Sequence, residues 1–145
     1  MELTSPAFAN NSPIPRKYTC KGEGVSPPLT VNGVPAGTQS LMLVVEDPDA
    51  PGGTFTHWTV WNISAATTLV REGSVPDSGL QGLNGFNKIG YGAPCPPSGT
   101  HRYFFKLYAL NRELALQPGA HAYAVTASLE GHVLARAELV GLVSA

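Results

Sequence analysis

Two proline-rich turns, each followed within a few residues by a histidine, constrain the fold of this chain more than any other sequence feature. The first is Asp47-Pro48-Asp49-Ala50-Pro51 ahead of His57, and the second is Cys95-Pro96-Pro97-Ser98-Gly99 ahead of His101. Proline fixes φ and has no N–H to donate, so each turn interrupts regular structure. With 13 prolines and 16 glycines among 145 residues, the chain favours short strands joined by turns over long helices.

Three segments have the pattern of β-strands. Ser40 to Glu46 is a continuous apolar run between turn signals, which is typical of a buried central strand. Phe55 to Ile63 and His101 to Leu110 are dense in aromatic and β-branched residues, which also favour strands. Asp47 to Gly53 is a turn, and the glycine-rich stretch from Val75 to Pro97 predicts a long irregular loop.

The two ends of the chain differ from this central part. The segment up to Pro35 is rich in Pro, Asn, Ser and Gly and predicts an extended, looping edge layer. Ala120 to Glu130 is alanine-rich and predicts a short helix with Gly131 as its C′ residue. Alternating apolar and polar residues from Val133 to Leu139 then predict a closing strand. The prediction is one mainly β domain over residues 1–145, an antiparallel β-sandwich with one or two short peripheral helices.

Composition makes several function classes poor candidates. Charged residues are 13% of the chain, against about 25% in a typical domain. The formal net charge of -1 offers no broad basic face for nucleic acid. No apolar run approaches the roughly 20 residues of a membrane span, and the N-terminus lacks the basic and apolar regions of a signal peptide. The expected location is therefore cytoplasmic.

Two cysteines, Cys20 and Cys95, lie far apart in the sequence. In a reducing cytosol the default interpretation is two free thiols, and the alternative is a disulfide that joins their two loops. The spacing gives neither a Cys-x-x-Cys metal motif nor a two-histidine helical pair, so no metal or cofactor is expected.

The polar residues next to the two turns are candidates for a binding site. Asp47 follows directly on the predicted central strand, where its carboxylate can bind a ligand amine or orient a histidine. His57 and His101 each begin a strand, so both can lie at one rim of the same sheet. Tyr103 is two residues after His101 and therefore shares its face of the strand. Turn capping is the expected role of Asp49.

Three further features bear on chemistry. Arg102 points to the face opposite His101 and is expected to form a structural ion pair, with the Asp47 turn region as a candidate partner. Residues 92–100 resemble a phosphate-binding loop only superficially, because no lysine follows Gly99 and three prolines lack an N–H. Free amides near Gly92 and Cys95 can still hold a small anion. A nucleophile–base pair of Ser98 with His101 is weak, because no orienting acid is evident.

Together these segments resemble the phosphatidylethanolamine-binding proteins, a family that includes Raf kinase inhibitor protein, and specifically the family's short bacterial and archaeal branch. The matching segments run in order through most of the chain: Tyr18-Thr19-Cys20-Lys21-Gly22-Glu23, Ser26-Pro27-Pro28-Leu29, Asp47-Pro48-Asp49-Ala50-Pro51, His57-Trp58, Asn62-Ile63, Gly90-Tyr91-Gly92-Ala93-Pro94-Cys95-Pro96-Pro97, His101-Arg102-Tyr103 and Glu130-Gly131-His132-Val133-Leu134. The combination is specific, although each piece alone is weak.

The resemblance implies a small anion pocket at one end of the sandwich. Carried over by position, its lining is Asp47, Ala50, Pro51, His57, Pro96, Pro97, His101 and Tyr103, with Phe55 at the mouth. It also implies a cis bond between Ala50 and Pro51. The spacing from Pro97 to His101 is shorter than in many relatives, and the long C-terminal helix of animal members has no counterpart before Ala145.

The resemblance and the residues together predict a non-catalytic binding protein for phosphate-like or carboxylate groups, such as phosphoethanolamine or phosphotyrosine-like ligands. The resemblance also suggests that such a protein has a regulatory role. One alternative is an inhibitor of a protease or kinase acting through protein contacts, and another is a hydrolase. Bacterial relatives often form homodimers, so self-association is also expected.

Overall fold

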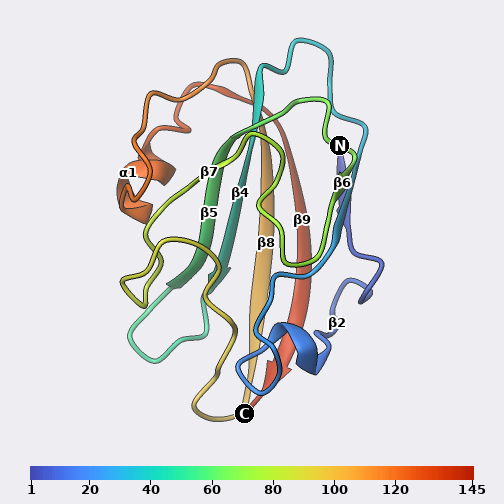
Figure 1. Cartoon of the computed structure of the whole chain (residues 1–145), viewed down its shortest axis with the longest axis vertical. Helices are drawn as coiled ribbons and strands as arrows, with labels where there is room; N and C mark the ends of the chain where they lie inside the picture. The colour runs from blue at the N-terminus through green and yellow to red at the C-terminus, as the bar shows by residue number, and fades with distance from the viewer.

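Two β-sheets of unequal size make up this computed structural model, which describes residues 1–145 (Figure 1). The larger sheet has the strand order β2 (Ser12–Pro13), β9 (Val133–Ser144), β8 (Thr100–Leu110), β4 (Ser40–Asp47), β5 (Phe55–Ile63) and β7 (Leu80–Gln81). The smaller sheet has the order β1 (Glu2–Thr4), β3 (Leu29–Asn32) and β6 (Leu69–Val70). All pairs are antiparallel except β2 with β9. The predicted mainly β sandwich is confirmed.

Strand β4 is buried on both faces, which explains its continuous apolar sequence. Leu41, Leu43 and Val45 point toward the smaller sheet and join a core of 19 buried residues. Met42 and Val44 point the other way, into a second cluster. Successive side chains of a strand alternate between faces, so only a strand covered on both sides needs apolar residues at every position.

The pairing of β4 decides where the functional residues meet. Because β4 runs antiparallel to both β5 and β8, its last residue, Asp47, lies beside the first residues of those two strands. The register pairs Asp47 with Phe55 of β5 and Glu46 with Phe104 of β8. The start of β8 and the end of β9 lie at the same end of the sheet (Figure 1).

The single α-helix, α1, spans Ala122–Ala127 and is shorter than the predicted helix over residues 120–130. It buries only Val125, on the second cluster, so little apolar contact is available to extend it. The prediction of Gly131 as its C′ residue is wrong, because the C-cap is Ser128. Gly131 instead adopts φ +80° in the turn before β9.

The remaining segments are mostly irregular, as expected. Residues 75–97 contain only the two-residue strand β7, and the N-terminal part contributes β1, β3 and the short 3-10 helix η1 (Arg16–Tyr18). The closing strand β9 extends to Ser144, further than the alternating pattern indicated. No helix is long and apolar enough to cross a membrane.

Candidate functional site

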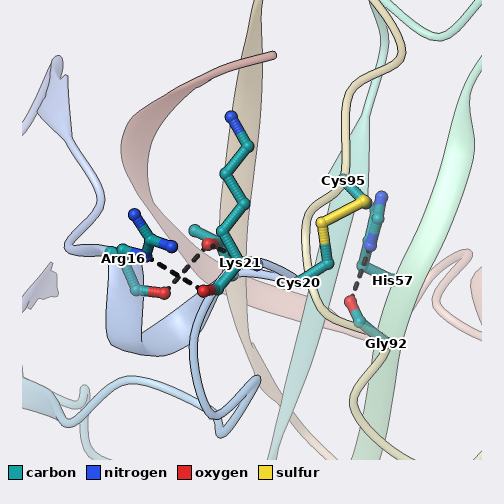
Figure 2. The surroundings of a disulfide bond; sticks show 7 residues. Arg16, Cys20, Lys21, His57, Gly92 and Cys95 are labelled. Carbon is teal, nitrogen blue, oxygen red and sulfur yellow. Dashed lines mark hydrogen bonds between the residues drawn. A yellow bond between two sulfur atoms is a disulfide. The ribbon is translucent and has the colours of Figure 1, made fainter.

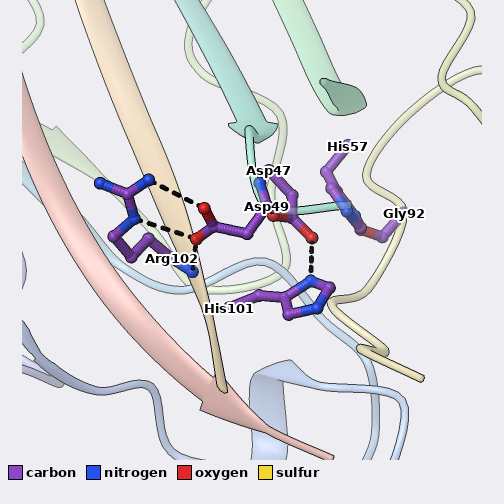
Figure 3. A network of polar contacts seen from close by, with 6 residues as sticks. All are labelled: Asp47, Asp49, His57, Gly92, His101 and Arg102. Carbon is purple, nitrogen blue, oxygen red and sulfur yellow. Dashed lines mark hydrogen bonds and ion pairs between the residues drawn. The ribbon is translucent and has the colours of Figure 1, made fainter. Parts of the chain in front are cut away.

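Asp47 lies at the end of β4, and its carboxylate is almost fully buried. Its Oδ1 accepts a hydrogen bond from the backbone N–H of Asp49 at 2.8 Å, and its Oδ2 lies 2.6 Å from Nδ1 of His101 (Figure 3). The first bond closes the turn locally. The second joins residues that are 54 positions apart and orients the imidazole at the start of β8.

Asp49 and Arg102 form an ion pair on the outer side of the same turn (Figure 3). Asp49 accepts hydrogen bonds from Nε and Nη2 of Arg102, at 2.9 and 2.8 Å, and from the Arg102 backbone N–H at 2.9 Å. These bonds lower the pKa of the Asp49 carboxyl to about 2. The ion pair expected between Arg102 and the turn is confirmed, and it fastens the turn to β8 outside the site.

His57 lies near the start of β5, with 3% of its surface exposed. Its Nδ1 is 2.7 Å from the carbonyl oxygen of Gly92, and the Gly92 N–H donates to the His57 carbonyl oxygen at 2.7 Å. Burial lowers the pKa of the imidazole. Gly92 thus has a role the sequence did not indicate: its N–H is already bonded, and its carbonyl orients His57.

Tyr103 lies close to both imidazoles and is buried on the same strand face as His101, as the strand parity predicted. Its ring centroid is 5.2 Å from that of His57 and 6.5 Å from that of His101. The ring is 1% exposed, and burial raises the pKa of the phenol, so Tyr103 stays protonated at neutral pH.

These side chains converge on a cavity of about 270 Å³. Its lining residues are Asp47, Ala50, Pro51, Phe55, His57, Phe86, Cys95, Pro96, Pro97, His101 and Tyr103. Every predicted pocket residue except Gly92 lies in this lining. Phe86 is the residue that sequence analysis missed; it comes from the irregular stretch before β8, and no local pattern signals a ring that packs 4.8 Å from Phe55.

A disulfide between Cys20 and Cys95 holds one side of the cavity (Figure 2). The default expectation of two free thiols is therefore wrong, because the fold brings the two Cα atoms to 5.4 Å across 75 residues. That distance lies within the range that a disulfide requires. A hydrogen bond from the Cys20 N–H to the Pro94 carbonyl oxygen, at 3.0 Å, runs beside the bridge.

The predicted cis bond between Ala50 and Pro51 is also wrong, because the chain has no cis peptide bond. The Gly53 N–H donates to the Ala50 carbonyl oxygen at 3.1 Å, which closes a turn with Pro51 at its second position. Proline is favoured at that position of the common β-turns, whereas the cis proline of a type VI turn occupies the third position.

The site offers ring nitrogens, a phenol and a carboxylate, but its lining contains no serine, no threonine and no free cysteine. Ser98 is exposed and lies outside the lining, and Cys95 is held in the disulfide. No group of three or more His, Cys, Asp or Glu side chains is placed to hold a metal ion. The arrangement is suited to holding a small polar group in one orientation.

A β-sandwich with this pocket at the end of its central strands belongs to a class of small ligand-binding proteins. The sequence matches the phosphatidylethanolamine-binding protein family over residues 4–144. The chain therefore belongs to the phosphatidylethanolamine-binding protein family.

Relatives and solved structures agree with this assignment. A UPF0098 protein of Methanothermobacter thermautotrophicus is 48% identical over 98% of this chain and 97% of its own length. A UPF0098 protein of Aquifex aeolicus is 48% identical over 98% of this chain and 87% of its own. The crystal structure of CT736, a putative phosphatidylethanolamine-binding protein homolog from Chlamydia trachomatis, superimposes with a TM-score of 0.95 at 42% identity, covering 99% of this chain and 97% of CT736. The crystal structure of YbcL of E. coli, described as a new member of the mammalian phosphatidylethanolamine-binding protein family, superimposes with a TM-score of 0.93 at 32% identity. The match covers 99% of this chain and 98% of YbcL.

Proposed function

We propose that this protein binds a small phosphate-type or carboxylate anion in the pocket, without catalysing a reaction on it. The observation that carries the proposal is the convergence of His57, His101 and Tyr103 on one cavity of about 270 Å³. Imidazolium and phenol groups donate hydrogen bonds to anionic oxygens. The cavity is slightly smaller than the usual range of about 300–1,000 Å³ for ligand pockets, which suits a head group better than a whole lipid.

The fastening of each side chain supports binding by a preorganised site. Asp47 holds His101, the Gly92 carbonyl holds His57, and the rings of Phe55 and Phe86 lie against His57 at centroid distances of 4.9 and 5.7 Å. Groups that are already ordered lose little conformational entropy when a ligand arrives.

The test is a titration of the protein with inorganic phosphate, phosphoethanolamine and phosphotyrosine, followed by the NMR shifts of the four histidines. We expect the resonances of His57 and His101 to move on saturation, while those of His121 and His132, which lie outside the cavity, stay still. His101→Ala is expected to weaken binding at least about tenfold through loss of a charge-assisted hydrogen bond, with His132→Ala as the matched control. Four unchanged histidines with all three ligands would refute the proposal.

The non-catalytic part of the proposal has a separate test. We expect no turnover of aryl phosphate or aryl ester substrates above the buffer rate, because no serine, threonine or free cysteine lines the cavity and the Tyr103 phenol stays protonated. Turnover that is abolished in His101→Ala would contradict it.

A further inference from the structure

The cavity contains no permanent cation. Its ionisable lining residues are Asp47, His57, His101 and Tyr103, with neither lysine nor arginine among them. Arg102 is bonded to Asp49 on the outer side of the turn. When both imidazoles are neutral, the charge that faces the cavity is therefore the single negative charge of Asp47, which repels an anion.

Hydrogen bonds also decide which nitrogen of each histidine carries a proton. The Gly92 carbonyl oxygen can only accept, so Nδ1 of His57 carries the hydrogen. The carboxylate of Asp47 likewise accepts from Nδ1 of His101. A neutral imidazole has one N–H, so in the neutral site both Nε2 atoms present a lone pair.

Both Nε2 atoms are open to the cavity. Neither atom hydrogen-bonds to a protein group. The buried side-chain polar atoms that lack a partner belong to Thr59, Trp61 and Thr67, so the unpaired Nε2 atoms are not fully enclosed by protein. Both histidines line the cavity. The neutral site thus turns two acceptors toward a ligand whose oxygens need donors.

We propose that the pocket binds its oxyanion only together with a proton, and that it therefore selects oxyanions that can take up a proton near neutral pH, such as phosphate and phosphate monoesters, over sulfate. This inference rests on the proposed function and names its ligand class. The P–O–H of a phosphate monoanion donates to Nε2 of a neutral histidine, or transfers its proton there to give an imidazolium and a phosphate dianion. Either outcome conserves the proton. Sulfate carries no proton at neutral pH, so its binding requires that a histidine take up a proton from solvent.

The titratable groups that face His57 come from two strands. Asp47 faces it from β4, and His101 and Tyr103 face it from β8. Burial lowers the pKa of His57 more than the hydrogen bond to Gly92 and the charge of Asp47 raise it, so its neutral form prevails in the empty site. Tyr103 stays protonated, since burial raises the pKa of the phenol.

The first experiment is calorimetry of the unmodified protein with inorganic phosphate and with sulfate at about pH 6, 7 and 8, the range over which histidine titrates. Each titration is repeated in two buffers of different ionisation enthalpy, which counts the protons taken up. We expect sulfate affinity to fall about tenfold per pH unit for each proton taken up. Phosphate is expected to bind at least about tenfold tighter than sulfate near pH 8, with the gap narrowing toward pH 6.

The second experiment uses His57→Asn. The asparagine amide can still donate to the Gly92 carbonyl oxygen, but the variant has no Nε2, so sulfate binding should take up fewer protons and its pH slope should flatten. His132→Asn, at the opposite end of the β8–β9 pair, is the matched control and should behave like the unmodified protein. An unchanged slope in His57→Asn would contradict the role given to His57.

The outcomes separate this inference from the proposed function. Equal affinities for phosphate and sulfate at every pH, with no proton uptake, would overturn the inference while leaving an anion site. Binding of neither anion at any pH would overturn the proposed function and the inference with it. If His57→Asn does not fold, the ratio of phosphate to sulfate affinity in the unmodified protein decides the question alone.

Discussion

The two proline-rich walls of the pocket are fastened in different ways. The turn wall, residues 47–51, is held by hydrogen bonds and by the ion pair of Asp49 with Arg102. The loop wall, residues 92–97, is held by the disulfide to Cys20 and by the bonds of Gly92 to His57. Each wall positions one histidine, so the same site depends on electrostatics on one side and on a covalent bridge on the other. Acid and salt should affect the turn wall, and reductant should affect the loop wall.

The largest effect is expected from removing the bridge in the double variant Cys20→Ser, Cys95→Ser. The disulfide closes a segment with a sequence separation of 75, and the chain-entropy relation assigns such a loop about 4.5 kcal/mol of stability. Urea unfolding of the variant beside the oxidised parent measures the difference. A loss below about 1 kcal/mol would show that hydrogen bonds alone hold the loop wall.

Asp47→Asn should have the next largest effect. When the single acceptor oxygen of Asn serves the Asp49 N–H, the amide nitrogen faces Nδ1 of His101. The charge-assisted hydrogen bond is then lost, and His101 must leave its Nδ1–H without a partner or change tautomer, at a cost of about 2 kcal/mol. Urea unfolding gives this loss, and phosphate titration should show weaker binding because no carboxylate fixes the orientation and tautomer of His101. Glu46→Gln, one residue earlier on β4 and paired with Lys106, is the control and should leave phosphate affinity unchanged. Equal effects of the two variants would remove the special role of Asp47.

A pair of glycine substitutions compares the packing of the loop wall with that of the residue directly after the turn wall. A Cβ at Gly92 would lie 2.6 Å from the Phe86 ring and 3.2 Å from Nδ2 of Asn84, whereas a Cβ at Gly52 meets nothing within 4 Å. Gly92→Ala should therefore cost about 1–2 kcal/mol, while Gly52→Ala should be neutral or slightly stabilising. Thermal unfolding of both variants measures the contrast, and a neutral Gly92→Ala would mean that Phe86 moves aside without cost.

Asp49→Asn should have the smallest effect, and it should appear in the acid dependence of stability. The pKa of Asp49 is lowered from 3.8 to about 2 in the folded protein. Its contribution is therefore present above about pH 4 and is lost as the pH falls from about 4 to about 2. Because the pair is partly exposed, the contribution is small and decreases with salt. The stability of Asp49→Asn should fall less steeply over that range than the stability of the parent, and parallel curves would contradict the assignment.

Much of the fold was predictable from local pattern. Residues 40–46, 55–63 and 101–110 became β4, β5 and β8 almost to the residue, because apolar and β-branched side chains satisfy both their backbone preference and their burial. The helix was predicted too long because alanine favours a helix but buries little surface. The free thiols were wrong because the meeting of Cys20 with Cys95 depends on tertiary contacts that local sequence does not encode. The cis proline, which the resemblance implied, was wrong because the local turn from Ala50 to Gly53 has a trans Pro51 at its second position.

In the site, too, some residues could be predicted from local sequence and others could not. Asp47, His57, His101 and Tyr103 were identifiable because turns and strand starts carry them, but Phe86 entered the lining without any local signal. Gly92 was the right residue with the wrong role, since its N–H bonds to His57 and its carbonyl fixes the tautomer of that ring.

By itself, the sequence determined which residues form strands, where the turns fall, and that two histidines and a carboxylate follow the turns. These properties depend on neighbours a few positions away. Only the tertiary structure decided that Asp47 meets His101, that Cys20 meets Cys95, and which nitrogen of each imidazole is left for a ligand. The antiparallel register of β4 with β5 and β8 sets the first of these, and hydrogen bonds across 35 and 54 residues set the last. Such contacts exist only after the strands have paired.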